Sequence, residues 1–112
     1  MSRDIGLYLE DIEIACQKVS RFTSGFTFKQ FTQDDEKFDA VLRNLEIIGE
    51  AIKNIPDEIQ SQYPHIKWRK IAGFRDIVAH HYFGVSDEIV WDIVENEIPN
   101  LLVQIKEISR NI

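Results

Sequence analysis

Residues 33–54 read QDDEKFDAVLRNLEIIGEAIKN, and the spacing of their apolar side chains decides the fold class. Steps of four and three residues keep side chains on one side of an α-helix. That spacing connects five positions without interruption, which are Val41, Leu45, Ile48, Ile52 and Ile55. Phe38, Leu42 and Gly49 lie beside this stripe and widen it. We therefore expect a helix over about residues 33–54 that ends at Pro56 and packs against partners on two sides.

The same spacing recurs in the sequence both before and after that helix. Apolar residues from Ile5 to Val19 predict a first helix, and those from Trp91 to Ile112 predict a last one. The last stripe continues through Pro99, where a kink is expected rather than a break. Ser24-Gly25 and Gly84 are suited to end helices. The pattern predicts helices over about residues 3–23, 33–54, 57–62, 65–83 and 87–112.

Residues 25–31 (GFTFKQF) alternate weakly like a strand, but they are too short and isolated to build a sheet. We expect their three phenylalanines to fill one end of the bundle. Thr32 is the expected N-cap of the following helix, with acidic residues in its first turn. The sequence therefore predicts one all-α domain over residues 1–112, an antiparallel four- to five-helix bundle.

The apolar stripes of the helix at 33–54 and of the last helix are wide. In the last helix, Val90, Ile93 and Val103 extend the stripe beyond one face. A bundle of this size cannot bury so many apolar faces against itself, so a homodimer formed through a helical face is expected.

Composition excludes several classes of protein. One cysteine, Cys16, rules out a disulfide within the chain and is expected to be a buried apolar residue. Apolar runs are far shorter than the roughly 18–20 residues of a membrane span. Acidic residues within residues 1–12 argue against a signal peptide, so a cytoplasmic protein without a membrane partner is expected.

The formal net charge of −6 argues against a protein that coats nucleic acid. Residues 65–82 are different, because this segment contains four basic residues and a single acidic one, Asp76. Such a patch can bind a phosphate or an acidic partner. A solvated helix face explains the same charges equally well. The basic residues of the segment are Lys67, Arg69, Lys70 and Arg75.

Residues 74–83 (FRDIVAHHYF) collect side chains that suit chemistry. On a regular helix Arg75 and Tyr82 lie about 20° apart, whereas His80 lies about 140° from Arg75. Asp76 and His80 form an i, i+4 pair in which the acid can orient the ring. One straight helix cannot direct Arg75 and His80 at one atom. Either the helix frays near His80, or a second chain completes the site.

Arginine beside histidine suits phosphoryl chemistry. A guanidinium holds a phosphate bidentately and stabilises the charge of the transition state. Histidine can take the proton of a ribose 2′-hydroxyl or give one to the leaving oxygen. The pair can cleave RNA without a metal, leaving a 2′,3′-cyclic phosphate. The alternative is structural: Arg75 on the surface, His80 at a helix end, and Tyr82 as a core aromatic.

Motifs of other enzyme classes are missing from the sequence. It contains no H-E-x-x-H, no paired-cysteine metal site, no glycine-rich phosphate loop and no G-x-S-x-G. Neither a metal nor a cofactor is therefore expected.

Residues 75–82 fit the pattern R-x4-H-x-Y, and several neighbouring stretches accompany it. They include RNLEIIGEA at 43–51, WRKIAGFRD at 68–76 and VWDIV at 90–94. With these motifs the chain resembles HepT-like proteins of the HEPN superfamily over nearly its whole length. The resemblance implies an all-α homodimer in which two motifs face each other across a cleft.

The same resemblance implies a toxin of a toxin–antitoxin pair that acts as a metal-independent endoribonuclease. Arg75 would stabilise the scissile phosphate and His80 would be the general acid or base, with Asp76 and His81 in support. Tyr82 matches the tyrosine to which the cognate antitoxin, a minimal nucleotidyltransferase of the MntA type, transfers AMP. The basic residues of the RNA-binding patch would be Lys67, Arg69 and Lys70. The alternative is a non-catalytic nucleotide-binding or adaptor subunit that complexes such a nucleotidyltransferase.

Overall fold

The computed structural model describes residues 4–81, 84 and 86–112. Over these residues the secondary structure is helical and includes no strand, so the prediction of an all-α fold is confirmed. The elements, in chain order, are α1 (Ile5–Thr23), α2 (Phe28–Gln33), α3 (Asp35–Ile52), α4 (Asp57–Gln62), α5 (Trp68–Ala72), α6 (Phe74–His81), α7 (Asp87–Asp92), the π-helical segment η1 (Ile93–Glu97) and α8 (Ile98–Asn111).

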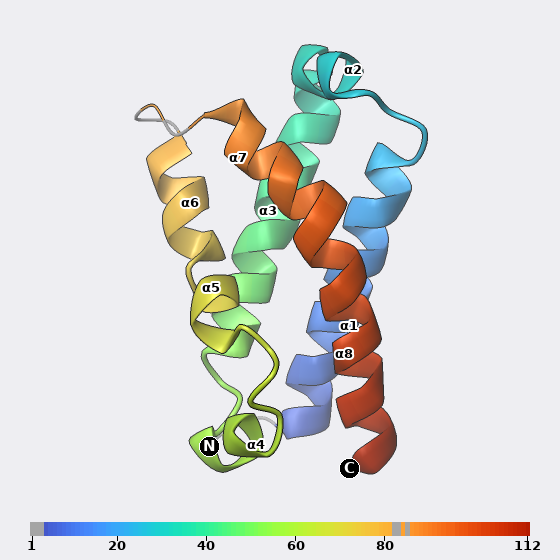
Figure 1. Ribbon diagram of the computed structural model, residues 1–112. Coiled ribbons are helices and arrows are strands. Elements are labelled where there is room, and N and C mark those ends of the chain that lie inside the picture. Colours follow the sequence, from blue (N-terminus) through green and yellow to red (C-terminus); the bar gives the residue numbers. More distant parts are fainter. Residues whose placement is uncertain (1–3, 82–83, 85) are drawn as a thin grey trace.

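The long helical segments run alternately up and down the bundle (Figure 1). α1 packs against α3 on one side and α8 on the other, and α3 also packs against α5 and α6. The short helix α2 covers the end of the bundle where α3 begins and α7 lies. This is the predicted antiparallel arrangement, and it places α6 on the outside of α3.

The core consists of the apolar stripes read from the sequence. The stripe of α3 is buried from Val41 to Ile52, and it belongs to the same core cluster as the buried stripes of α1 and α8. Cys16 is part of this core, and burial raises the pKa of its thiol to about 12. The fully buried core residues of the flanking helices include Leu9, Ile12, Val19, Ile98, Leu101, Ile105 and Ile108.

Residues 25–31 form a turn and a short helix. α2 begins with a capping box in which the Thr27 hydroxyl accepts from the Gln30 N–H at 3.1 Å and the Gln30 side chain accepts from the Thr27 N–H at 2.9 Å. Phe31 is fully buried and stacks on Phe38 with ring centroids 4.6 Å apart. Its ring also lies 5.1 Å from that of Trp91. Of the three phenylalanines expected to fill this end of the bundle, Phe31 is fully buried, whereas Phe26 and Phe28 are half-buried.

Thr32 is not the N-cap of α3, and that prediction is wrong. Thr32 lies inside α2, whose N-cap is Thr27, five residues before the expected one. Asp34 caps α3 instead, and its carboxylate accepts from the Lys37 N–H at 3.0 Å.

The helix expected from about residue 65 to Gly84 is divided. α5 begins only at Trp68, whose indole N–H donates to the Tyr63 carbonyl at 3.0 Å. Gly73 then separates α5 from α6. Glycine is a poor residue for a helix interior, and a Cβ at this position would lie 3.2 Å from the Lys70 carbonyl oxygen. α6 ends at His81 among the described residues, and Gly84 beyond it has a φ of 109°, in the region that suits glycine.

The last helix contains a π turn at Ile93–Glu97, directly before Pro99. The N–H of Ile98 donates to the carbonyl of Ile93, five residues earlier, which puts both side chains on one face. The irregularity expected near Pro99 therefore takes the form of a π turn that leaves the segment helical.

The expectation that Val90 and Ile93 are exposed is wrong, because both are buried. The π turn brings Ile93 onto the core face, and α7 and η1 contact α2 and α1. Val103 is exposed as expected, at 65% of its surface. Among the described residues α3 presents no large exposed apolar side chain, so the apolar argument for a homodimer through that helix no longer holds.

No helix within the described ranges combines the length and apolar character needed to cross a membrane.

Candidate functional site

α6 presents one face to the bundle and the opposite face to solvent. Phe74 and Val78 are buried against the core and fix the helix. Arg75, Asp76, Ala79 and His80 are exposed. The helix is regular as far as His81, so the fraying that could have brought His80 towards Arg75 does not occur. On this regular helix the two side chains point about 140° apart within one chain.

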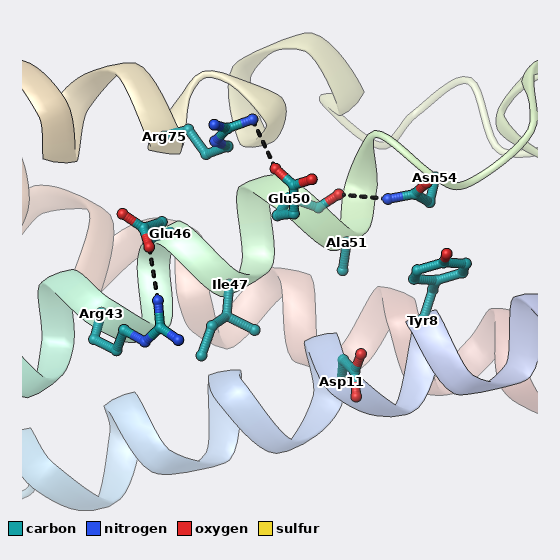
Figure 2. Close-up of a pocket in the computed structure, with 9 residues that line it drawn as sticks. All are labelled: Tyr8, Asp11, Arg43, Glu46, Ile47, Glu50, Ala51, Asn54 and Arg75. Carbon is teal, nitrogen blue, oxygen red and sulfur yellow. Dashed lines mark hydrogen bonds and ion pairs between the residues drawn. The ribbon is translucent and has the colours of Figure 1, made fainter. Parts of the chain in front are cut away.

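The Arg75 guanidinium is paired with Glu50 of α3. Its Nη1 atom lies 2.6 Å from Oε2 of Glu50 (Figure 2). Both side chains are well exposed, at 44% and 59% of their surfaces, so solvent screens the pair. The contact uses one edge of the guanidinium. The Nε and Nη2 atoms form the edge that can hold a phosphate with two parallel hydrogen bonds.

Arg75 also lies at the rim of a groove with a volume of about 430 Å³ (Figure 2). α3 forms its floor and α1 forms its far wall. A second ion pair, between Arg43 Nη1 and Glu46 Oε1 at 2.8 Å, lies one turn along α3. The groove is lined by Tyr8, Asp11, Arg43, Glu46, Ile47, Glu50, Ala51, Asn54 and Arg75.

Gly49 lets α6 approach α3 closely at this point. A Cβ atom at position 49 would lie 2.9 Å from Cγ of Arg75, 3.0 Å from its backbone nitrogen and 3.3 Å from the Ala72 carbonyl oxygen. The sequence pattern placed Gly49 in a wide apolar stripe, and both Gly49 and Glu50 lie within the stretch quoted at 43–51, but neither residue was predicted to have a role in the site. Both residues are distant from Arg75 along the chain, and helical periodicity gives no sign of such a contact.

The His80 ring is oriented by its own helix. Its Nδ1 atom lies 2.7 Å from the backbone carbonyl oxygen of Asp76. A carbonyl oxygen only accepts, so in the neutral ring Nδ1 carries the hydrogen and Nε2 has the lone pair. The sequence predicted that the Asp76 carboxylate orients this ring, whereas the contact observed is made by the Asp76 backbone carbonyl. His80 therefore presents Nε2 as the atom that can take up a proton.

His81 faces the bundle instead. Its Nε2 atom lies 2.9 Å from Oδ1 of Asp87, and its ring centroid lies 5.0 Å from that of Phe38. The two adjacent histidines thus have different surroundings. His81 connects the end of α6 to the start of α7 and to α3.

The basic residues of the expected RNA-binding patch are all exposed, but Lys70 is also engaged in an ion pair. Lys70 Nζ lies 2.7 Å from Oε1 of Glu97, and this hydrogen bond raises the pKa of the lysine. Lys67 and Arg69 are exposed at the start of α5. Lys70 is therefore directed towards η1.

Tyr82 lies outside the described residues. Across the part of the chain that is described, no three or more histidine, cysteine, aspartate or glutamate side chains gather in an arrangement that would hold a metal ion.

Comparison with known proteins places this site in a family context. The family described as "Ribonuclease HepT-like" matches residues 12–108, which include both α3 and α6. A protein of Methanocaldococcus jannaschii named "Putative RNase MJ0127" is 42% identical over 110 residues, covering 98% of this chain and 91% of that protein. "Probable ribonuclease HepT" of Thermococcus cleftensis is 44% identical over 101 residues, covering 90% and 92%. No solved structure gives a significant match. The chain therefore belongs to the ribonuclease HepT-like family.

Proposed function

We propose that this protein is a metal-independent endoribonuclease and the toxin of a toxin–antitoxin pair in the cytoplasm. The observation that carries the proposal is the outer face of α6, which in a member of this family exposes an arginine and a histidine whose Nδ1 atom is held by the Asp76 carbonyl. RNA is the substrate class that uses both, because its 2′-hydroxyl is an internal nucleophile next to every phosphate.

The reaction is a transesterification. Arg75 holds the scissile phosphate through two hydrogen bonds. Nε2 of a neutral His80 takes the proton of the 2′-hydroxyl as O2′ bonds to phosphorus. The bond from phosphorus to O5′ breaks, and the protonated His80 then gives O5′ its proton. The products are a 2′,3′-cyclic phosphate and a 5′-hydroxyl.

A homodimer supplies the two groups that one helix cannot direct at one phosphate. Within one chain Arg75 and His80 point in different directions along a regular α6. Two copies of α6 related by a two-fold axis bring Arg75 of one chain opposite His80 of the other.

Control by a nucleotidyltransferase antitoxin is the second part of the proposal. Its support is the R-x4-H-x-Y motif, in which Tyr82 follows His80 by two residues. AMP attached to Tyr82 adds negative charge and bulk to the motif, which repels RNA. Mass spectrometry after co-expression with such an enzyme should show AMP adducts on Tyr82. Inhibition without any adduct would instead indicate simple occlusion.

The nuclease is tested with purified variants and RNA in a buffer that contains a metal chelator. Arg75→Ala and His80→Ala should each lower the cleavage rate by at least about 100-fold. Arg110→Ala and His65→Ala are the matched controls, because they remove an exposed arginine and an exposed histidine that do not line the groove. Unchanged cleavage in both site variants would refute the proposal.

The alternative function, an adaptor subunit that complexes a nucleotidyltransferase, makes a different prediction. The wild-type protein would then bind that enzyme without cleaving RNA, and Arg75→Ala would not relieve growth arrest in an expression host.

A further inference from the structure

We propose that Gly49 and Glu50, neighbours on α3, position the Arg75 guanidinium for phosphate binding. Gly49 sets how close α6 lies to α3, and Glu50 fixes the orientation of the guanidinium plane. The inference rests on the nuclease function proposed above and assigns it two positioning residues that do not contact the reacting atoms.

Gly49 acts through the backbone of α6. An added Cβ would meet both the side chain and the main chain of Arg75, at 2.9 and 3.0 Å. Real Cβ atoms essentially never lie 2.9 Å from another carbon, and 3.0 Å from a backbone nitrogen is tighter than nine in ten real Cβ contacts. A larger residue at position 49 therefore moves the Arg75 side chain and shifts α6 away from α3. Because Arg75 is the residue that contacts position 49, its side chain is displaced together with that helix.

Glu50 acts on the guanidinium directly. A carboxylate in an RNA-binding site repels phosphate, and an exposed ion pair contributes little to stability. Glu50 is therefore costly for binding and of little use to folding. What it does supply is orientation: with Nη1 held at 2.6 Å, the planar group presents its Nε and Nη2 edge in one direction. Preorganisation of this kind lowers the cost of reaching the transition state.

Glu46 provides a matched control for Glu50. It lies one turn earlier on α3, lines the same groove and pairs with an arginine at a similar distance, but that arginine is Arg43. Glu50→Gln and Glu46→Gln therefore remove the same charge from the same groove, and only the first releases Arg75.

The experiment measures kcat and KM for cleavage of a short fluorescent RNA by both variants. Glu50→Gln should lower kcat by about tenfold without raising KM, because binding loses a repulsive charge while orientation is lost. Glu46→Gln should leave kcat within about twofold of wild type. Glu50→Asp keeps the charge on a shorter side chain and should restore part of kcat.

Two further variants separate positioning from stability. Gly49→Ala should lower kcat by at least about tenfold, with circular dichroism showing a folded protein. In an Arg75→Lys background, Glu50→Gln should have little additional effect, because both substitutions act through the same group. If Gly49→Ala does not fold, the comparison of Glu50→Gln with Glu46→Gln still decides.

Equal kcat values for Glu50→Gln and Glu46→Gln would overturn the inference. A kcat for Glu50→Gln above that of wild type would also overturn it, and would show that Glu50 competes with RNA for Arg75. Failure of the nuclease proposal looks different, because Arg75→Ala itself would then cleave RNA at the wild-type rate.

Discussion

His81 of α6 contacts Asp87 of α7 through Nε2 and Oδ1 at 2.9 Å, while its neighbour His80 points to solvent. The side chain of His81 is only 19% exposed and lies against Phe38. Two adjacent histidines therefore have separable roles, one in packing and one in the proposed reaction.

This difference predicts opposite phenotypes for two alanine variants. His81→Ala should lower the free energy of unfolding by about 1–3 kcal/mol, because it removes a packed ring and a hydrogen bond. His80→Ala should change it by less than about 0.5 kcal/mol and should abolish RNA cleavage. Urea denaturation followed by circular dichroism measures the first effect. Equal stability losses in the two variants would contradict the assignment.

The homodimer predicts complementation between inactive variants. Light scattering should give the mass of two 13.1 kDa chains. When Arg75→Ala and His80→Ala chains are mixed and allowed to exchange, a mixed dimer contains one site with both residues intact. Random exchange should restore about a quarter of wild-type activity. No recovery from a mixture shown by mass spectrometry to contain mixed dimers would argue that each chain has its own complete site.

The ion pair of Lys70 predicts unequal contributions to RNA binding. Because Glu97 already neutralises Lys70, Lys70→Ala should weaken binding less than Arg69→Ala does. Arg69→Ala should also reduce the slope of log K against log salt by about one unit. Fluorescence anisotropy with a 2′-O-methylated RNA, which cannot be cleaved, measures both quantities. Glu97→Gln should tighten binding by releasing Lys70, and weaker binding by that variant would contradict this account.

The buried thiol of Cys16 predicts slow labelling and a dependence of stability on pH. Burial raises its pKa from 9.0 to about 12, so the folded protein should react with a thiol reagent only at the rate of unfolding. Between pH 9 and 12 the unfolded chain loses this proton while the folded chain keeps it. Stability should therefore fall as pH rises, by up to about 1.4 kcal/mol per pH unit from this group.

The pH-dependent slope should be smaller in Cys16→Ala, which serves as the control. Labelling of the native protein as fast as that of a free thiol would show that the site opens without unfolding.

The parts of the fold that could be predicted from the sequence are those set by local periodicity. The stripe from Val41 to Ile55 repeats every three or four residues, and the helix that it predicts is present as α3. The bounds of α4 were also predicted, because Pro56 starts that helix and Tyr63-Pro64 follows it. Such signals lie within a few residues of the structure that they cause.

The errors arose where structure depends on contacts or on a changed period. Ile93 was expected to be exposed because a regular α-helix was assumed, and the π turn rotates it into the core. Thr32 lost the capping role because Thr27, with Gln30, begins an earlier helix. In the candidate site, the motif identified Arg75 and His80, but the pairing of Arg75 with Glu50 required the packing of α6 on α3.

The π turn at Ile93–Glu97 makes the end of the bundle sensitive to the number of residues in its last helix. The π turn contains one residue more than a regular α-helical turn. Deleting one of its residues would therefore rotate α7 by about 100° relative to α8. Trp91, which lies on Phe31, would then face away from α2. A substitution at exposed Glu95 or Asn96 leaves the rotation of α7 relative to α8 unchanged. The packing of this end of the bundle therefore depends on the number of residues in the helix and not on which residues occupy positions 95 and 96.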